Sequence, residues 1–125
     1  MLAAVAAALA ACGTGLDVAT APTTVSLTMK VGDYPSLATP NGVVFVSANS
    51  SPIAVVRTGA SSFVALSRIC PHQGATVGQA SFGFQCPRHG AQFNTVGQWI
   101  GGQPTGSMHG YSAQYDATTD ILTIG

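Results

Sequence analysis

Two short segments of the chain each place a cysteine and a histidine beside proline and glycine. They are Cys70-Pro71-His72-Gln73-Gly74 and Cys86-Pro87-Arg88-His89-Gly90. Thiolate and imidazole are both metal ligands, so the two segments together offer two sulfurs and two nitrogens. A Cys₂His₂ zinc finger normally pairs cysteine with cysteine and histidine with histidine, whereas each segment here supplies one ligand of each kind. This division suits two adjacent metal ions, one bound through sulfur and the other through nitrogen.

The pattern resembles the Rieske [2Fe–2S] family. The resemblance extends from Ser67 to about Tyr115. Its first motif is Cys-x-His followed by Gln-Gly. Its second motif is Cys-Pro-x-His-Gly followed, three residues later, by the aromatic residue Phe93. The segment Gly101-Gly102-Gln103-Pro104 resembles the third loop of the family, which packs over the cluster. The resemblance implies that one iron binds Cys70 and Cys86 and that the other binds His72 and His89, with the imidazoles at the exposed tip.

The resemblance also implies which residues surround the cluster, namely Gly74, Arg88, Gly90, Ala91, Phe93 and Pro104. We expect Gly74 and Gly90 to let the backbone approach the cluster and to aim N–H groups at its sulfurs. Relatives of high potential place a serine and a tyrosine hydroxyl at the positions of Ala91 and Phe93, and neither side chain here can donate a hydrogen bond. We therefore predict a reduction potential below the upper end of the family range, which is about −150 to +300 mV.

A disulfide joins the two cluster loops in many members that belong to membrane complexes. Its cysteines would fall at Ala75 and Arg88, and both positions lack cysteine here. The loops must therefore be held by packing, by the region of Pro104 and by the cluster itself.

The rest of the chain is typical of an all-β fold. The 125 residues include 15 glycines and 7 prolines, and the apolar runs are short and rich in Val, Phe and Ile. We expect Rieske-like stacked antiparallel sheets with the two cluster-binding loops at one end, because no stretch with helical periodicity appears after residue 12. The predicted strands are Val25–Lys30, Val43–Ser47, Ile53–Arg57, Phe63–Ile69, Phe82–Gln85, Gly110–Tyr115 and Ile121–Ile124.

The N-terminal residues differ in kind from the rest. Residues 1–12 form an apolar run of about the length of a signal peptide, too short to cross a bilayer as a helix. Leu9-Ala10-Ala11-Cys12-Gly13 resembles a bacterial lipobox and predicts lipid attachment at Cys12, although no Lys or Arg precedes the apolar core. Ordinary cleavage after a small residue and a retained apolar anchor are the alternatives. We expect a signal or lipobox-like segment over 1–12, a flexible tether over 13–24 and a Rieske [2Fe–2S] domain over 25–125.

Sparse charge limits the classes of function. Four Lys/Arg and four Asp/Glu leave no basic stripe for nucleic acid and no acidic tail. We expect an exported one-electron carrier on the outer face of the bacterial cytoplasmic membrane or in the periplasm. It would act alone or as the small redox subunit of an oxidoreductase, with a cytochrome or another subunit as its redox partner.

Two alternatives remain open. The first is the Rieske subunit of a cytochrome bc-type quinol-oxidising complex, in which His72 or His89 would accept a hydrogen bond from quinol. The second is a zinc-stabilised binding module. No carboxylate pair and no Ser-His-Asp arrangement supports a catalytic site in the chain itself. We do not expect an oxygenase catalytic subunit either, because 125 residues hold no second domain for a mononuclear iron.

Several residues with possible chemistry have simpler roles. We expect His109 to be a solvated loop residue, and Trp99, Tyr111, Met29 and Met108 to be packing residues. Three aspartates are predicted to lie in turns: Asp33, Asp116 and Asp120.

Overall fold

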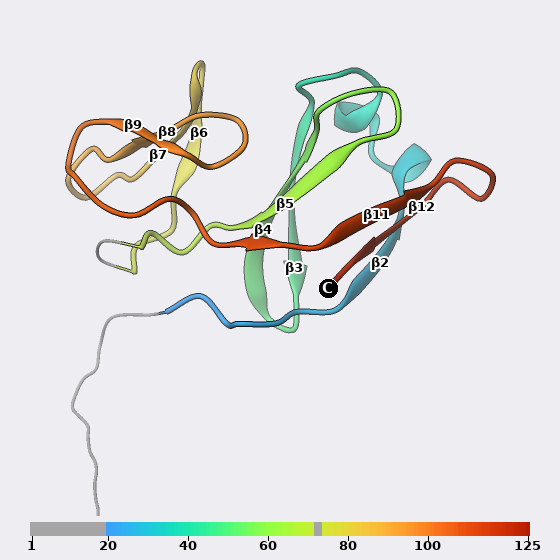
Figure 1. Cartoon of the computed structure of the whole chain (residues 1–125), viewed down its shortest axis with the longest axis horizontal. Helices are drawn as coiled ribbons and strands as arrows, with labels where there is room; N and C mark the ends of the chain where they lie inside the picture. The colour runs from blue at the N-terminus through green and yellow to red at the C-terminus, as the bar shows by residue number, and fades with distance from the viewer. Residues whose placement is uncertain (1–19, 72–73) are drawn as a thin grey trace, which may run out of the picture.

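A four-stranded antiparallel sheet forms the central layer of the molecule (Figure 1). The computed structural model describes residues 20–71 and 74–125. The sheet runs in the order β10 (Gly110–Tyr111), β5 (Phe63–Ser67), β4 (Ser51–Arg57) and β3 (Val43–Ala48). Successive side chains of a strand point to opposite faces, so Ile53 and Val55 enter one core while Ala54 and Val56 enter another. Both faces of β4 are covered, and residues 52–56 within it form a continuous apolar run.

A three-stranded antiparallel sheet covers one face of the central sheet. Its order is β11 (Ala113–Asp116), β12 (Ile121–Ile124) and β2 (Leu27–Lys30). Leu37 and Leu122 lie fully buried in the core between the two sheets, and the rings of Phe63 and Tyr115 meet there at 4.9 Å. Two short 3-10 turns, η1 (Val31–Asp33) and η2 (Pro35–Leu37), connect β2 to the central sheet.

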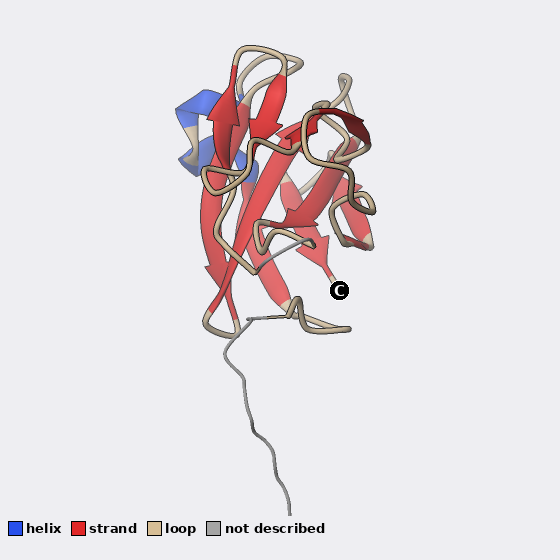
Figure 2. Ribbon diagram, turned by 90° about the vertical axis from the view of Figure 1, so that its left-hand side faces the viewer, coloured by secondary structure: helices blue, strands red, loops and turns tan. Residues whose placement is uncertain are grey.

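A second four-stranded antiparallel sheet lies against the other core. It runs in the order β6 (Gly78–Ala80), β7 (Gly83–Gln85), β8 (Gln92–Phe93) and β9 (Trp99–Gly101). Phe84 and Phe93 are fully buried and pack with residues of β4 and β5. Since β5 and β10 are paired neighbours, residues 68–109 form an insertion that projects from one end of the central sheet (Figures 1 and 2).

The predicted all-β class with stacked antiparallel sheets is confirmed. The strand predicted over Ile121–Ile124 is observed with those bounds, whereas the one predicted over Gly110–Tyr115 is two strands. Residue Ser112 separates them, because β10 pairs with β5 and β11 pairs with β12. The short strands β6, β8 and β9 were not predicted. Within the described residues, no helix has the length and apolar character that a membrane crossing requires.

Candidate metal centre

The first loop spans residues 70–75, and its described ends, residues 70–71 and 74–75, continue a narrow hairpin. The Val77 amide donates to the Arg68 carbonyl at 2.7 Å, and Ile69 forms an antiparallel bridge with Thr76. At the tip the Cys70 amide donates to the Ala75 carbonyl at 2.6 Å. These contacts hold the loop closed immediately beneath Cys70.

The second loop, residues 86–91, repeats this arrangement between β7 and β8. The Cys86 amide donates to the Ala91 carbonyl at 2.8 Å, as Cys70 does to Ala75. In each loop the amide of a glycine four residues after the cysteine donates back to the cysteine carbonyl, at 2.8 Å for Gly74 and 3.1 Å for Gly90. The two loops therefore close by the same pair of hydrogen bonds.

The same glycines have left-handed backbones, with φ of 71° at Gly74 and 76° at Gly90, which glycine adopts without a steric cost. We expected these residues to aim N–H groups at the cluster sulfurs. Their own amides donate to the cysteine carbonyls and close the turns, and the contact of backbone N–H groups with the cluster sulfurs stays a prediction.

A sequence signal for the matched loops was overlooked. Both loops read Cys-Pro-x-x-Gly-Ala, and they differ in whether histidine is the third residue, as at His72, or the fourth, as at His89. The hexapeptide repeat predicts a common backbone, because the cysteine and the left-handed glycine occupy the same positions in both copies.

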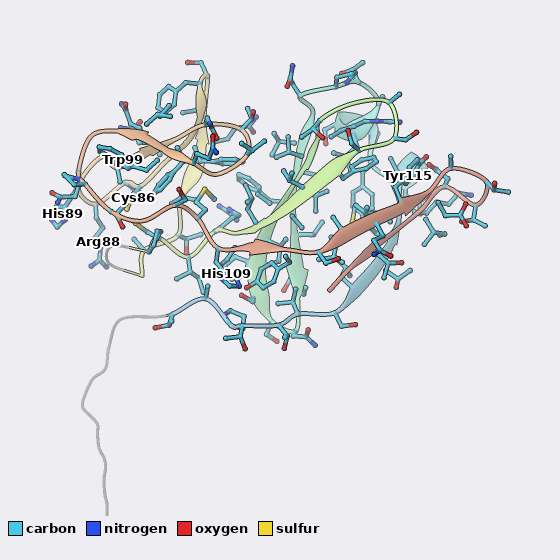
Figure 3. All side chains as sticks on the ribbon, viewed as in Figure 1. Cys86, Arg88, His89, Trp99, His109 and Tyr115 are labelled. Carbon is cyan, nitrogen blue, oxygen red and sulfur yellow. The ribbon has the colours of Figure 1, made fainter. Side chains whose placement is uncertain are left out.

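The candidate ligands differ in their burial. Cys70 and Cys86 are each 1% exposed and belong to the same apolar cluster, and neither forms a disulfide among the described residues. His89 and Arg88 are exposed, and Figure 3 shows them at the outer edge of this region, with Cys86 nearer the middle of the molecule. The second loop thus has its cysteine buried and its histidine exposed.

Two candidate residues, His72 and Cys12, lie outside the described residues. In residues 20–71 and 74–125, no three His, Cys, Asp or Glu side chains are grouped so that they could hold a metal ion. Among the described residues of the two loops, the metal ligands are thus two buried thiols and one exposed imidazole, to which His72 would add the fourth donor. Two soft ligands on the dry side, with His89 on the wet side and His72 in the same loop as Cys70, make a donor set that fits a [2Fe–2S] cluster with unequal irons.

The floor of the region is apolar. Ala91 is 1% exposed and Phe93 is fully buried, and both pack in the cluster that contains the two cysteines. Neither side chain carries a hydrogen-bond donor.

The third loop, residues 101–109, packs against the second. Gly102 has φ of +72°, and a Cβ atom added there would lie 2.0 Å from the Gly90 carbonyl oxygen. Farther along, the Met108 amide donates to the Gly97 carbonyl at 2.8 Å. Pro104 is exposed on this loop. Trp99 is 39% exposed rather than fully packed, and its indole N–H donates to the Gln103 carbonyl at 3.0 Å, which ties the third loop to β9.

A fixed positive charge lies at the base of the first loop. The Arg68 guanidinium sits 3.6 Å from the centre of the Phe45 ring, and its Nε donates to the Val77 carbonyl at 3.1 Å. Burial lowers the pKa of Arg68, although an arginine remains charged at neutral pH. This side chain braces the stem of the loop through packing and a hydrogen bond, a role that the sequence did not reveal.

Stacked antiparallel sheets with two matched, cysteine-bearing hairpin tips at one end are typical of a small iron–sulfur electron-transfer domain. The Rieske [2Fe–2S] domain model matches residues 28–115, which is more than half of the chain, and the protein belongs to this family. A search of curated protein sequences finds no match.

Solved structures of Rieske proteins share the fold. The cyanobacterial plasma membrane Rieske protein PetC3 from Synechocystis PCC 6803 is 25% identical, with a TM-score of 0.58 over 67% of this chain and 86% of that one. The ferredoxin of carbazole 1,9a-dioxygenase from Nocardioides aromaticivorans IC177 is 20% identical, with a TM-score of 0.54 over 85% of this chain and 98% of that one. The quaternary ammonium Rieske monooxygenase CntA, in its apo form, is 20% identical, with a TM-score of 0.66 over 82% of this chain. The match spans 33% of the CntA chain.

Membership of the family implies a Rieske-type [2Fe–2S] cluster and an electron carrier that works with a redox partner. The family match favours this reading over a zinc-stabilised module. The predicted family and cofactor are thereby confirmed.

Proposed function

We propose that the chain is an exported, membrane-tethered one-electron carrier, acting alone or as the small redox subunit of an oxidoreductase. The observation that carries this proposal is the pair of matched loops, in which both cysteines are buried while His89 is exposed. A buried thiolate side and an exposed imidazole side give an electron a defined exit toward a docked protein.

In this proposal Cys70 and Cys86 hold one iron, and His72 and His89 hold the other. When bound, the cluster accepts and releases one electron, at a potential that its imidazole ligands raise above that of an all-cysteine centre. The chain contributes rigidity, because both loops are closed by backbone hydrogen bonds and the third loop packs against the second. A rigid site changes little in shape when its charge changes, which favours rapid transfer.

The surroundings of the site are proposed to keep the potential in the lower part of the family range. Ala91 and Phe93 line the buried side without a donor that could stabilise added negative charge. Arg88 opposes this trend with its positive charge, but its exposure allows solvent and salt to screen it. The remaining residues around the cluster are proposed to affect the site by fixing the shape of the loops, and they are Gly74, Gly90 and Pro104.

Attachment to the membrane is proposed through a lipid on Cys12, which would place the domain on the outer face of the bacterial cytoplasmic membrane. The lipobox-like sequence that ends at Cys12 supports it. The plasma membrane location in the name of PetC3 is compatible with such a placement. We keep the division into residues 1–12, 13–24 and 25–125 as part of the proposal.

The exposure of His89 favours a second candidate, the Rieske subunit of a quinol-oxidising cytochrome bc-type complex. An exposed imidazole edge is the group with which a quinol hydroxyl would form a hydrogen bond. Co-purification of a cytochrome b with the native protein would support this candidate over the stand-alone carrier.

Substitution of the histidines tests the ligand assignment. We expect His72→Cys and His89→Cys each to yield either a markedly lower reduction potential or no cluster, because a thiolate adds negative charge. His109→Ala is the matched control, since this histidine belongs to neither loop, and it should retain the cluster. Normal iron content and potential in both cysteine variants would contradict the proposed ligands.

A further inference from the structure

The described chain begins beside the first loop. Thr20 and Ala21 line a pocket of about 300 Å³ together with Cys70 and Pro71. In Figure 1 the start of the described chain lies at the same end of the molecule as the first loop, and the hairpin of β11 and β12 lies at the opposite end. The N-terminal segment therefore enters the domain at the end that carries the cluster loops.

A side-chain hydrogen bond holds the segment there. The Tyr111 hydroxyl donates to the Pro22 carbonyl oxygen at 2.7 Å. Tyr111 lies on β10, where it pairs with Ala65 of β5, and the ring of His109 packs edge-on against it at 4.8 Å. We name the contact between Tyr111 and Pro22 the tyrosine clip.

The clip is connected to the stem of the first loop. Ser67, a residue with no exposed surface, ends β5, the strand with which β10 pairs. The Ile69 amide donates to Ser67 Oγ at 3.1 Å, and the Ser67 amide donates to the His109 carbonyl at 2.8 Å. Burial raises the pKa of Tyr111, so its hydroxyl remains a donor at neutral pH.

Chain length then limits how far this end can move from an anchor at Cys12. Pro22, which the clip holds, is ten residues beyond Cys12, and this length of chain spans at most about 33–36 Å, however it is arranged. If the clip opened, the next firm attachment would be Val25, which is 5% exposed. Val25 is thirteen residues beyond Cys12, so the reach would then be about 43–47 Å, an increase of about 1.3-fold.

We infer that the tyrosine clip keeps the cluster end of the domain close to the membrane, and that the partner is a redox protein bound to the same membrane with its cofactor near the bilayer surface. Four Lys/Arg and four Asp/Glu give little long-range attraction toward a soluble partner. A shared membrane supplies instead the high local concentration that tethering provides. This inference rests on the proposed lipid anchor.

The test uses the full-length native protein bound to phospholipid vesicles that contain a quencher-labelled lipid. A fluorophore is attached to a cysteine introduced by Gly106→Cys in the third loop, or by Thr118→Cys in the turn between β11 and β12. Both positions are exposed, and Gly106 has open space around it. We expect a greater loss of fluorescence at position 106 than at 118, and equal or reversed losses would overturn the inference.

Two further measurements test whether the tyrosine clip causes the difference in quenching between the two positions. Tyr111→Phe removes the clip hydroxyl and should decrease the quenching at position 106. Tyr115→Phe is the matched control, because its hydroxyl bonds Asp120 rather than the N-terminal segment, and it should leave the quenching unchanged. Unchanged quenching in Tyr111→Phe would overturn the role of the clip.

The mass of the native N-terminus separates this inference from the proposed function. A chain without lipid on Cys12 would overturn the proposed anchor and the inference with it. A lipid-bearing chain with equal quenching at the two positions would overturn the inference alone.

Discussion

Gly102 provides the sharpest test of how the third loop supports the site. Its φ of +72° is a left-handed conformation, and an added Cβ would lie 2.0 Å from the Gly90 carbonyl oxygen and 3.3 Å from Ala91 Cα. Both neighbouring atoms belong to the backbone of the second loop, so no side-chain rotation can relieve the overlap. Gly102→Ala must therefore separate the third loop from the second.

The expected loss of stability in Gly102→Ala follows from the left-handed backbone and from the overlap with the second loop. A left-handed conformation alone costs a non-glycine residue about 1–2 kcal/mol, and the overlap with Gly90 adds to this value. A destabilisation of about 2 kcal/mol lowers the melting temperature of a domain of this size by roughly 8–16 °C. We expect a decrease of that order in the temperature at which the reconstituted protein loses the visible absorption of its cluster.

Gly106→Ala is the matched control on the same loop. No atom lies within 4 Å of the position of its Cβ, so we expect a change within about 0.5 kcal/mol. If Gly102→Ala and Gly106→Ala lost the cluster at the same temperature, the third loop would not be packed against the second as described.

Three other predictions concern the potential, the core and the dependence on pH. Ala91→Ser adds a hydroxyl donor on the buried side of the second loop and should raise the reduction potential; a redox titration with an unchanged midpoint would show that the hydroxyl does not act on the cluster. Phe84→Ala removes a fully buried ring beneath the loops and should cost about 3–5 kcal/mol in urea unfolding, whereas Phe82→Ala, in the adjacent turn and 37% exposed, should cost far less; similar losses would contradict the burial of Phe84. Hydrogen bonds donated by the Tyr115 hydroxyl and the Gly32 amide lower the pKa of Asp120, so its carboxylate contributes stability that is present above the unfolded pKa of about 3.9 and is lost as the pH falls through the lower folded value. Asp120→Asn should accordingly destabilise the protein at pH 7 and much less at pH 2, and an equal loss at both pH values would refute this assignment.

The strands with a strong hydrophobic pattern could be predicted from the sequence. Ile121–Ile124 alternates between buried and exposed positions, and residues 52–56 of β4 form a continuous apolar run, so both stand out from the polar turns around them. Strand partners could not be predicted in this way. The run from Gly110 to Tyr115 serves two sheets, because the periodicity of a strand does not specify which neighbour it pairs with.

The strands around the cluster loops were harder to predict for a physical reason. β6, β8 and β9 contain two or three residues each, with glycine and glutamine among them, and carry little hydrophobic pattern. Their pairing follows from the hairpin turns, from the close approach of Gly102 to Gly90 and from the burial of Phe84 and Phe93. Local composition does not encode contacts of this kind.

The candidate ligands were easier to predict from the sequence than the contacts that hold the surrounding loops in place. Ligand chemistry and spacing placed sulfur inside and imidazole outside, and the second loop has this arrangement. The tyrosine clip and the Arg68 brace depend on contacts between distant parts of the chain, such as Tyr111 with Pro22 and Arg68 with Phe45. No spacing rule connects those residues.

The most direct measurement is the EPR spectrum of the purified protein after reduction, taken together with its iron and sulfide content. Two irons and two sulfides per chain, with a rhombic signal of low average g value, are the predicted result for two irons held by unequal ligands. A colourless protein that contains one zinc ion and gives no EPR signal would contradict the cluster at these two loops.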